Sequence, residues 1–197
     1  MQIDYEKWHE GIGYDLDALA EIPEHERAGI EATLVAHATR DWRDVQALAA
    51  LGTPTAREAL RHAFRDGDAG IRMAVLREAS ELIPEDAKTA ALVDALKHAD
   101  FAGGLSPALD QVETFHPPEV VDALIRGVLE RPREAAVNFA AMLFYVRGEA
   151  VEPFDWEQRP FFLRFATDDR QEREAAFREL CSRIGVDPEP YLASSGR

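Results

Sequence analysis

The chain has one cysteine, Cys181, in 197 residues, so it has no internal disulfide and suits a reducing compartment. Basic residues are scarce: 22 Lys and Arg stand against 37 Asp and Glu, which gives a formal net charge of −15. Because nucleic-acid affinity depends on basic side chains that release phosphate counterions, this charge argues against a nucleic-acid-binding function. No apolar run approaches the roughly 20 residues of a membrane span, and the acidic N-terminus lacks the apolar region of a secretion signal. We therefore expect a cytoplasmic protein with no nucleic-acid or membrane partner.

The sequence also lacks the sustained apolar–polar alternation of β-strands. Apolar residues recur instead at helical spacing, as in the stripe at Phe177, Leu180, Cys181 and Ile184. This stripe indicates that Cys181 is a small buried residue rather than a reactive thiol. The sequence predicts an all-α protein.

Several helix ends carry capping residues. Asp168 and Gln171 resemble a capping box at the start of the last long helix, and Gly185 follows its end. The acidic pairs Asp15/Asp17 and Asp66/Asp68 each precede an expected helix. We interpret these pairs as caps rather than cation ligands, since carboxylates at helix starts bind free N–H groups.

Helix-breaking positions recur along the chain. Prolines 54, 84, 117 and 153 are separated by 30, 33 and 36 residues. A short sequence motif also recurs at residues 58–62, 94–98 and 122–126, and it begins with Glu-Ala-Leu or Asp-Ala-Leu. An irregular period in the thirties, with room for two helices per unit, is typical of an α-solenoid.

Two stretches carry a family resemblance. Residues 47–60 resemble the helix–turn–helix of HEAT-like repeats, and residues 66–76, with acids followed by Arg72, are similar to the start of that family's next repeat. The resemblance covers about residues 41–147 and implies a short HEAT-like solenoid of stacked antiparallel helix pairs. It implies one domain over residues 1–197, comprising an N-terminal cap (1–40), repeats (41–147), an aromatic segment with a capping helix (148–185) and a tail (186–197).

Motifs for catalysis, metal binding or cofactor binding are missing from the sequence. No two histidines have the i, i+4 spacing of a zinc-binding helix, and the glycines at 11 and 13 lack the third glycine of a dinucleotide-binding loop. We therefore expect no cofactor, no metal and no enzymatic activity.

The expected binding residues come from the repeats and the aromatic segment. The recurring motif places Glu58, Asp94 and Asp122 at equivalent positions, which predicts a row of carboxylates for a basic protein partner. Trp156 and Arg159 are residue types typical of interface hot spots. The alternative is that their segment, 154–165, is a hydrophobic cap that covers the end of the repeat stack. The segment can serve both as a cap and as a binding surface if some rings face inward and Trp156 faces outward.

These features favour a protein-binding module. Small acidic HEAT-like chains resemble immunity proteins that neutralise bacterial toxins, and this resemblance implies a basic toxin as the partner. Two alternatives remain: a scaffold or adaptor subunit of a larger assembly, and a lyase-type enzyme, since HEAT-like repeats also occur in bilin lyases.

Overall fold

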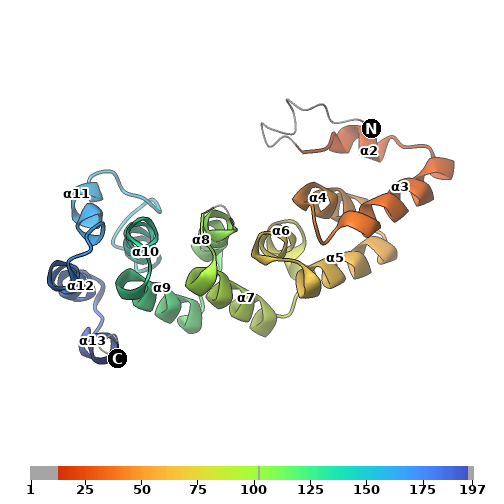
Figure 1. Ribbon diagram of the computed structural model, residues 1–197. Helices are drawn as coiled ribbons and strands as arrows, with labels where there is room; N and C mark the ends of the chain where they lie inside the picture. Colours follow the sequence, from red (N-terminus) through yellow and green to blue (C-terminus); the bar gives the residue numbers. More distant parts are fainter. Residues whose placement is uncertain (1–12, 102, 195–197) are drawn as a thin grey trace. The chain divides into compact units, whose positions relative to one another are not determined.

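Helices form all the regular secondary structure of residues 13–101 and 103–194, which are the residues that this computed structural model describes (Figure 1). No strand occurs among them, which confirms the all-α prediction. The chain divides into two compact units, residues 1–88 and 89–197.

The first unit contains α2 (Leu16–Ala20), α3 (Glu24–His37), α4 (Trp42–Leu51), α5 (Pro54–Asp66), α6 (Ala69–Ala79) and the 3-10 helix η1 (Ser80–Leu82). Helix α7 (Glu85–His98) begins at the end of this unit and continues into the second. The second unit then contains α8 (Leu105–Thr114), α9 (Pro118–Glu130), α10 (Arg133–Val146), α11 (Arg159–Phe162), η2 (Leu163–Phe165), α12 (Arg170–Ile184) and α13 (Glu189–Ser194).

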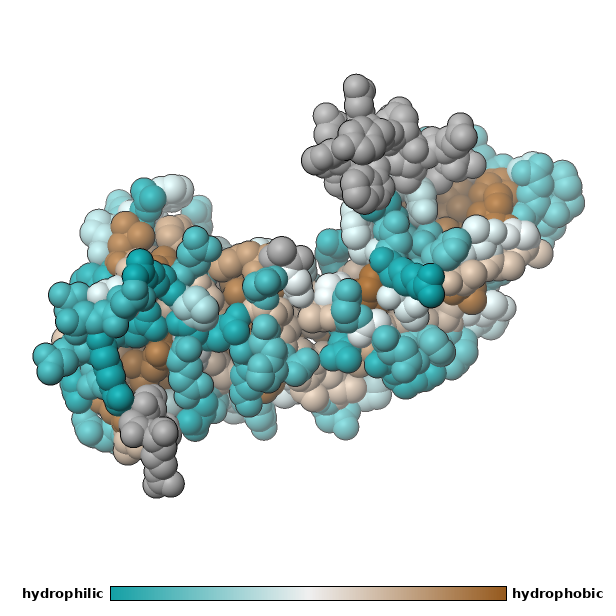
Figure 2. All heavy atoms as spheres, viewed as in Figure 1, coloured by the Kyte–Doolittle hydropathy of each residue, from teal (hydrophilic) through white to brown (hydrophobic). Residues whose placement is uncertain are grey.

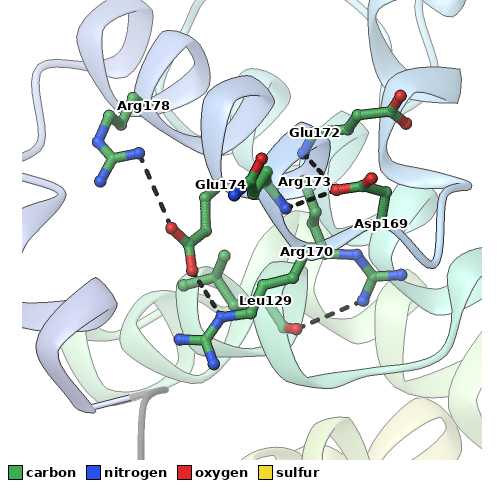
Figure 3. A network of polar contacts seen from close by, with 8 residues as sticks. Leu129, Asp169, Arg170, Glu172, Arg173, Glu174 and Arg178 are labelled. Atoms are coloured by element: carbon green, nitrogen blue, oxygen red, sulfur yellow. Dashed lines mark hydrogen bonds and ion pairs between the residues drawn. The ribbon is translucent and has the colours of Figure 1, made fainter.

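Acidic caps begin several of these helices. The carboxylates of Asp15 and Asp68 accept hydrogen bonds from backbone N–H groups three residues ahead, at 3.0 and 2.9 Å, as the sequence predicts. At α12 the prediction was wrong by one residue, because Asp169 rather than Asp168 caps the helix (Figure 3). The Asp168 side chain is instead engaged by the guanidinium of Arg133. Gly185 ends α12 with a φ of 69°, a left-handed conformation that glycine adopts without strain.

The first unit is organised around α4, which packs against α2, α3, α5 and α6. Leu48 on α4, Leu60 on α5 and Met73 on α6 are almost completely buried in its core. Trp42 holds two guanidiniums over its ring, those of Arg43 and Arg77, at 4.8 and 5.6 Å from the centroid.

The second unit is organised around α10, which packs against α8, α9, α11, η2 and α12. Helices α9 and α10 approach closely at Gly127, where an added Cβ would lie 2.2 Å from the buried ring of Phe139. The rings of Phe161, Phe162 and Phe165 are buried beside α10. Much of the aromatic segment therefore belongs to the core.

Two arginines of the second unit reach back to the end of an earlier, non-consecutive helix. Arg131 donates to the carbonyls of Lys97 and Ala99 at the end of α7. Arg173 of α12 donates to the carbonyl of Leu129 at the end of α9, at 3.4 Å (Figure 3), and to that of Arg131 just after it, at 3.0 Å. Each guanidinium thus binds carbonyls that the end of a helix leaves without an intrahelical partner.

Replacing the second of these arginines is expected to loosen α12. Arg173→Met keeps the length of the side chain but leaves the part-buried carbonyls at the end of α9 without a donor, so the free energy of unfolding falls by about 1.5–2 kcal/mol. Arg170→Met is the matched control, since the one side-chain contact of Arg170 within the described residues is an exposed ion pair with Glu174, worth less than about 0.5 kcal/mol. Urea unfolding measures both variants. Equal losses would show that Arg173 does not anchor α12.

Among the described residues, no helix has both the length and the apolar character needed to cross a membrane.

Candidate protein-binding groove

A groove follows the accessible side of α10 in the second unit. It consists of three adjoining hollows of about 630, 490 and 180 Å³. Phe101 lines all three, Glu134 is common to the first two, and Asn138 is common to the last two. We call this feature the α10 groove.

The two smaller hollows of the groove have a largely apolar lining. Val137 and Met142 come from α10, Leu109 comes from α8, and Phe154 and Leu163 come from the aromatic segment. Two apolar side chains remain accessible here, since Phe101 is 38% and Leu163 47% exposed. Figure 2 shows hydrophobic atoms exposed between hydrophilic ones on this unit. An accessible apolar lining with a polar border is typical of protein-binding surfaces.

Carboxylates outnumber cations around the groove. Six acidic residues line it, against three arginines. The arginines, all at one end, already have partners: Arg131 and Arg173 donate to backbone carbonyls, and Arg133 pairs with Asp168.

At the other end of the groove, both charged residues of the lining are acidic. Asp110 and Glu113 lie one turn apart on α8, and neither pairs with a cation in the part of the chain that the structure describes. Partial burial raises the pKa of Glu113, and the neighbouring charge of Asp110 raises it further. Binding of a cation would relieve this repulsion, so the geometry favours a basic group at this end.

Trp156 and Arg159 lie beside this end of the groove. The Trp156 side chain is 68% exposed, and the Arg159 guanidinium lies 4.9 Å from the centroid of its ring. The indole also meets Phe154 edge-on, with 6.0 Å between ring centroids, and Phe154 lines the groove. The structure thus brings this predicted pair to the groove while the phenylalanines after it enter the core. The binding role of the pair stays a prediction.

The predicted row of carboxylates lies elsewhere. Glu58 is on α5, in the other unit, and pairs with Arg61 at 3.3 Å. Asp94 on α7 lies 4.0 Å from His98, and Asp122 on α9 accepts hydrogen bonds from Arg126 and Tyr191. None of the three lines the α10 groove. Their role in binding stays a prediction.

Sequence reasoning missed Asp110, Glu113 and Glu134. They lie outside the recurring motif, and residues 101–107 depart most from the repeat pattern. A usable signal was present, because the i, i+3 spacing of Asp110 and Glu113 places two carboxylates on one side of a helix that begins just after Phe101.

Cys181 is buried within the helical core, as its place in the apolar stripe predicts. Burial raises the pKa of its thiol to about 11, and the nearby carboxylate of Asp187 adds to the shift. The thiolate is therefore a very minor species at neutral pH. Across residues 13–101 and 103–194, no three His, Cys, Asp or Glu side chains group as metal ligands would.

No protein-family model matches this chain, and comparison with curated proteins and with solved structures likewise finds no match.

Proposed function

We propose that this protein is a non-catalytic binding module whose α10 groove holds an apolar segment of a basic protein. The observation that carries the proposal is the pairing of an accessible apolar lining with Asp110 and Glu113, two carboxylates without a cationic partner among the described residues. Apolar side chains of the partner would cover Phe101 and Leu163, and a lysine or arginine would meet the two carboxylates.

We further propose that the helices stack as a short α-solenoid, in keeping with the resemblance to HEAT-like repeats. Contacts between alternate helices support this arrangement within each unit, since α4 packs on α6 and α8 packs on α10. The similar contacts of Arg131 and Arg173, each with the end of an earlier helix, also support it. Such folds present one helix of each pair to a partner, and α8 and α10 would be those helices here.

The net charge of −15 supports a basic partner, because opposite charge accelerates encounter. By the resemblance to immunity proteins, we propose a basic toxin as that partner. Toxins that act on nucleic acid need a basic surface to hold their substrate. An acidic groove would compete with the nucleic acid for that surface.

The test uses an amphipathic helical peptide of leucine and lysine as the probe. We expect Asp110→Lys together with Glu113→Lys to weaken peptide binding about tenfold or more and to reduce its dependence on salt, because the two carboxylates supply the local attraction. Fluorescence anisotropy of a labelled peptide, at low and moderate salt, measures both quantities.

The matched control is Asp17→Lys together with Glu21→Lys in the first unit. It changes the net charge by the same amount at exposed positions outside the groove. We expect it to lower affinity by less than about threefold. Equal losses in the two double variants would mean that overall charge, and not the groove, attracts the peptide.

A further inference from the structure

The first unit contains a separate cavity of about 350 Å³ between α2, α3 and α4. This volume falls within the usual range of small-molecule sites. Most of its walls are apolar and come from all three helices: Ala18, Leu19, Ile22, Ile30, Leu34 and Ala47. Figure 2 shows hydrophobic surface in the region of α2 and α3.

One carboxylate, that of Asp44, lies among these mainly apolar walls. Asp44 is only 4% exposed, and its Oδ1 accepts a hydrogen bond from the Tyr14 hydroxyl at 3.0 Å. Tyr14, Thr33 and His37 are the other polar residues of the lining, to which no lysine or arginine of residues 13–101 and 103–194 contributes. The adjacent Arg43 directs its guanidinium to Asp41 and to the ring of Trp42.

The buried carboxylate carries an energetic penalty that a ligand can relieve. Burial is the main cause that raises the pKa of Asp44, while the Tyr14 hydrogen bond and the charges of His37 and Arg43 act in the opposite direction. A carboxylate in apolar surroundings is stabilised most by a cation in direct contact with it. The apolar walls select against small hydrated metal ions, which would have to shed water without gaining further oxygen ligands.

We propose that this cavity binds a small organic cation, an ammonium group on an apolar body, with the ammonium at Asp44 and the apolar body against Leu19, Ile30 and Leu34. A neutral apolar ligand would fill the same space but bring no positive charge against the carboxylate. The site is independent of the α10 groove, because all its residues belong to the first unit.

The probe is n-hexylammonium, with n-hexanol as its neutral counterpart of equal chain length. In NMR titrations of the whole labelled chain, we expect hexylammonium to shift signals of α2, α3 and α4 saturably and to bind at least about tenfold more tightly than hexanol. Asp44→Asn retains an oxygen that accepts the Tyr14 hydrogen bond but carries no charge. We expect it to bind the two compounds equally.

Two further measurements keep the test decisive if Asp44→Asn does not fold. In the unaltered protein, bound hexylammonium should move the titration of the Asp44 carboxyl carbon to lower pH, since a cation stabilises the ionised form. Ile30→Trp should fill the cavity and abolish the hexylammonium shifts while far-UV circular dichroism stays unchanged. Equal affinity for both probes, an unmoved Asp44 titration, or undiminished binding by Ile30→Trp would overturn the proposal.

Discussion

Phe162→Ala is expected to lower the free energy of unfolding by about 3–5 kcal/mol, the usual loss for a buried phenylalanine. The ring is fully buried and meets three other rings, those of Phe144, Phe154 and Phe161, at centroid distances of 5.2, 5.8 and 6.0 Å. Truncation removes the apolar contacts and leaves a cavity that the surrounding helices fill only in part.

Leu163→Ala is the control for this substitution. Leu163 is the next residue in the chain, yet 47% of it is exposed, so its truncation should lower stability by less than about 1 kcal/mol. Chemical denaturation followed by circular dichroism compares the two variants. A small loss for Phe162→Ala would show that the aromatic segment does not seal the core beside α10.

Gly127→Ala is expected to destabilise the protein by about 3 kcal/mol, although alanine is the better helix former. The added Cβ would lie 2.2 and 2.3 Å from Cε2 and Cδ2 of Phe139. That ring is fully buried and cannot move into open space. Helices α9 and α10 would therefore have to separate.

Gly29→Ala on α3 is the control, for which we expect the opposite change in stability. Apart from its own helix backbone and chain neighbours, no described atom lies within 4 Å of the position that its Cβ would take, so only helix propensity acts, and stability should rise by about 0.5–1 kcal/mol. The difference in melting temperature between the two alanine variants measures the cost of the clash between the added methyl group at position 127 and the Phe139 ring. If both variants were stabilised, the close approach of α9 and α10 at Gly127 would be wrong.

The helical fold could be predicted from sequence because its signals are local. The stripe at residues 177–184 lies on α12, Pro54 begins α5, and Gly185 follows the end of α12. These signals depend on backbone geometry within a few residues. The error at Asp168 has a tertiary cause: its side chain binds Arg133, 35 residues earlier, and leaves the cap to Asp169.

The groove could not be predicted because it depends on residues that are distant in the sequence. Phe101 and Phe154 line one hollow although 53 positions separate them. The recurring sequence motif pointed to Glu58, Asp94 and Asp122, whereas the groove is lined mainly by α8, α10 and the aromatic segment, with the end of α9 and the start of α12 at one end. Repetition in the sequence did not point to the helices that border the hollow.

Mapping the bound leucine–lysine peptide by NMR tests the central claim most directly. We expect amide shifts that saturate with peptide and that cluster in α8, α10 and residues 154–163, since these segments line the α10 groove. Shifts spread over both units without saturation, or centred on Glu58, Asp94 and Asp122, would contradict the assignment of the groove as the binding site.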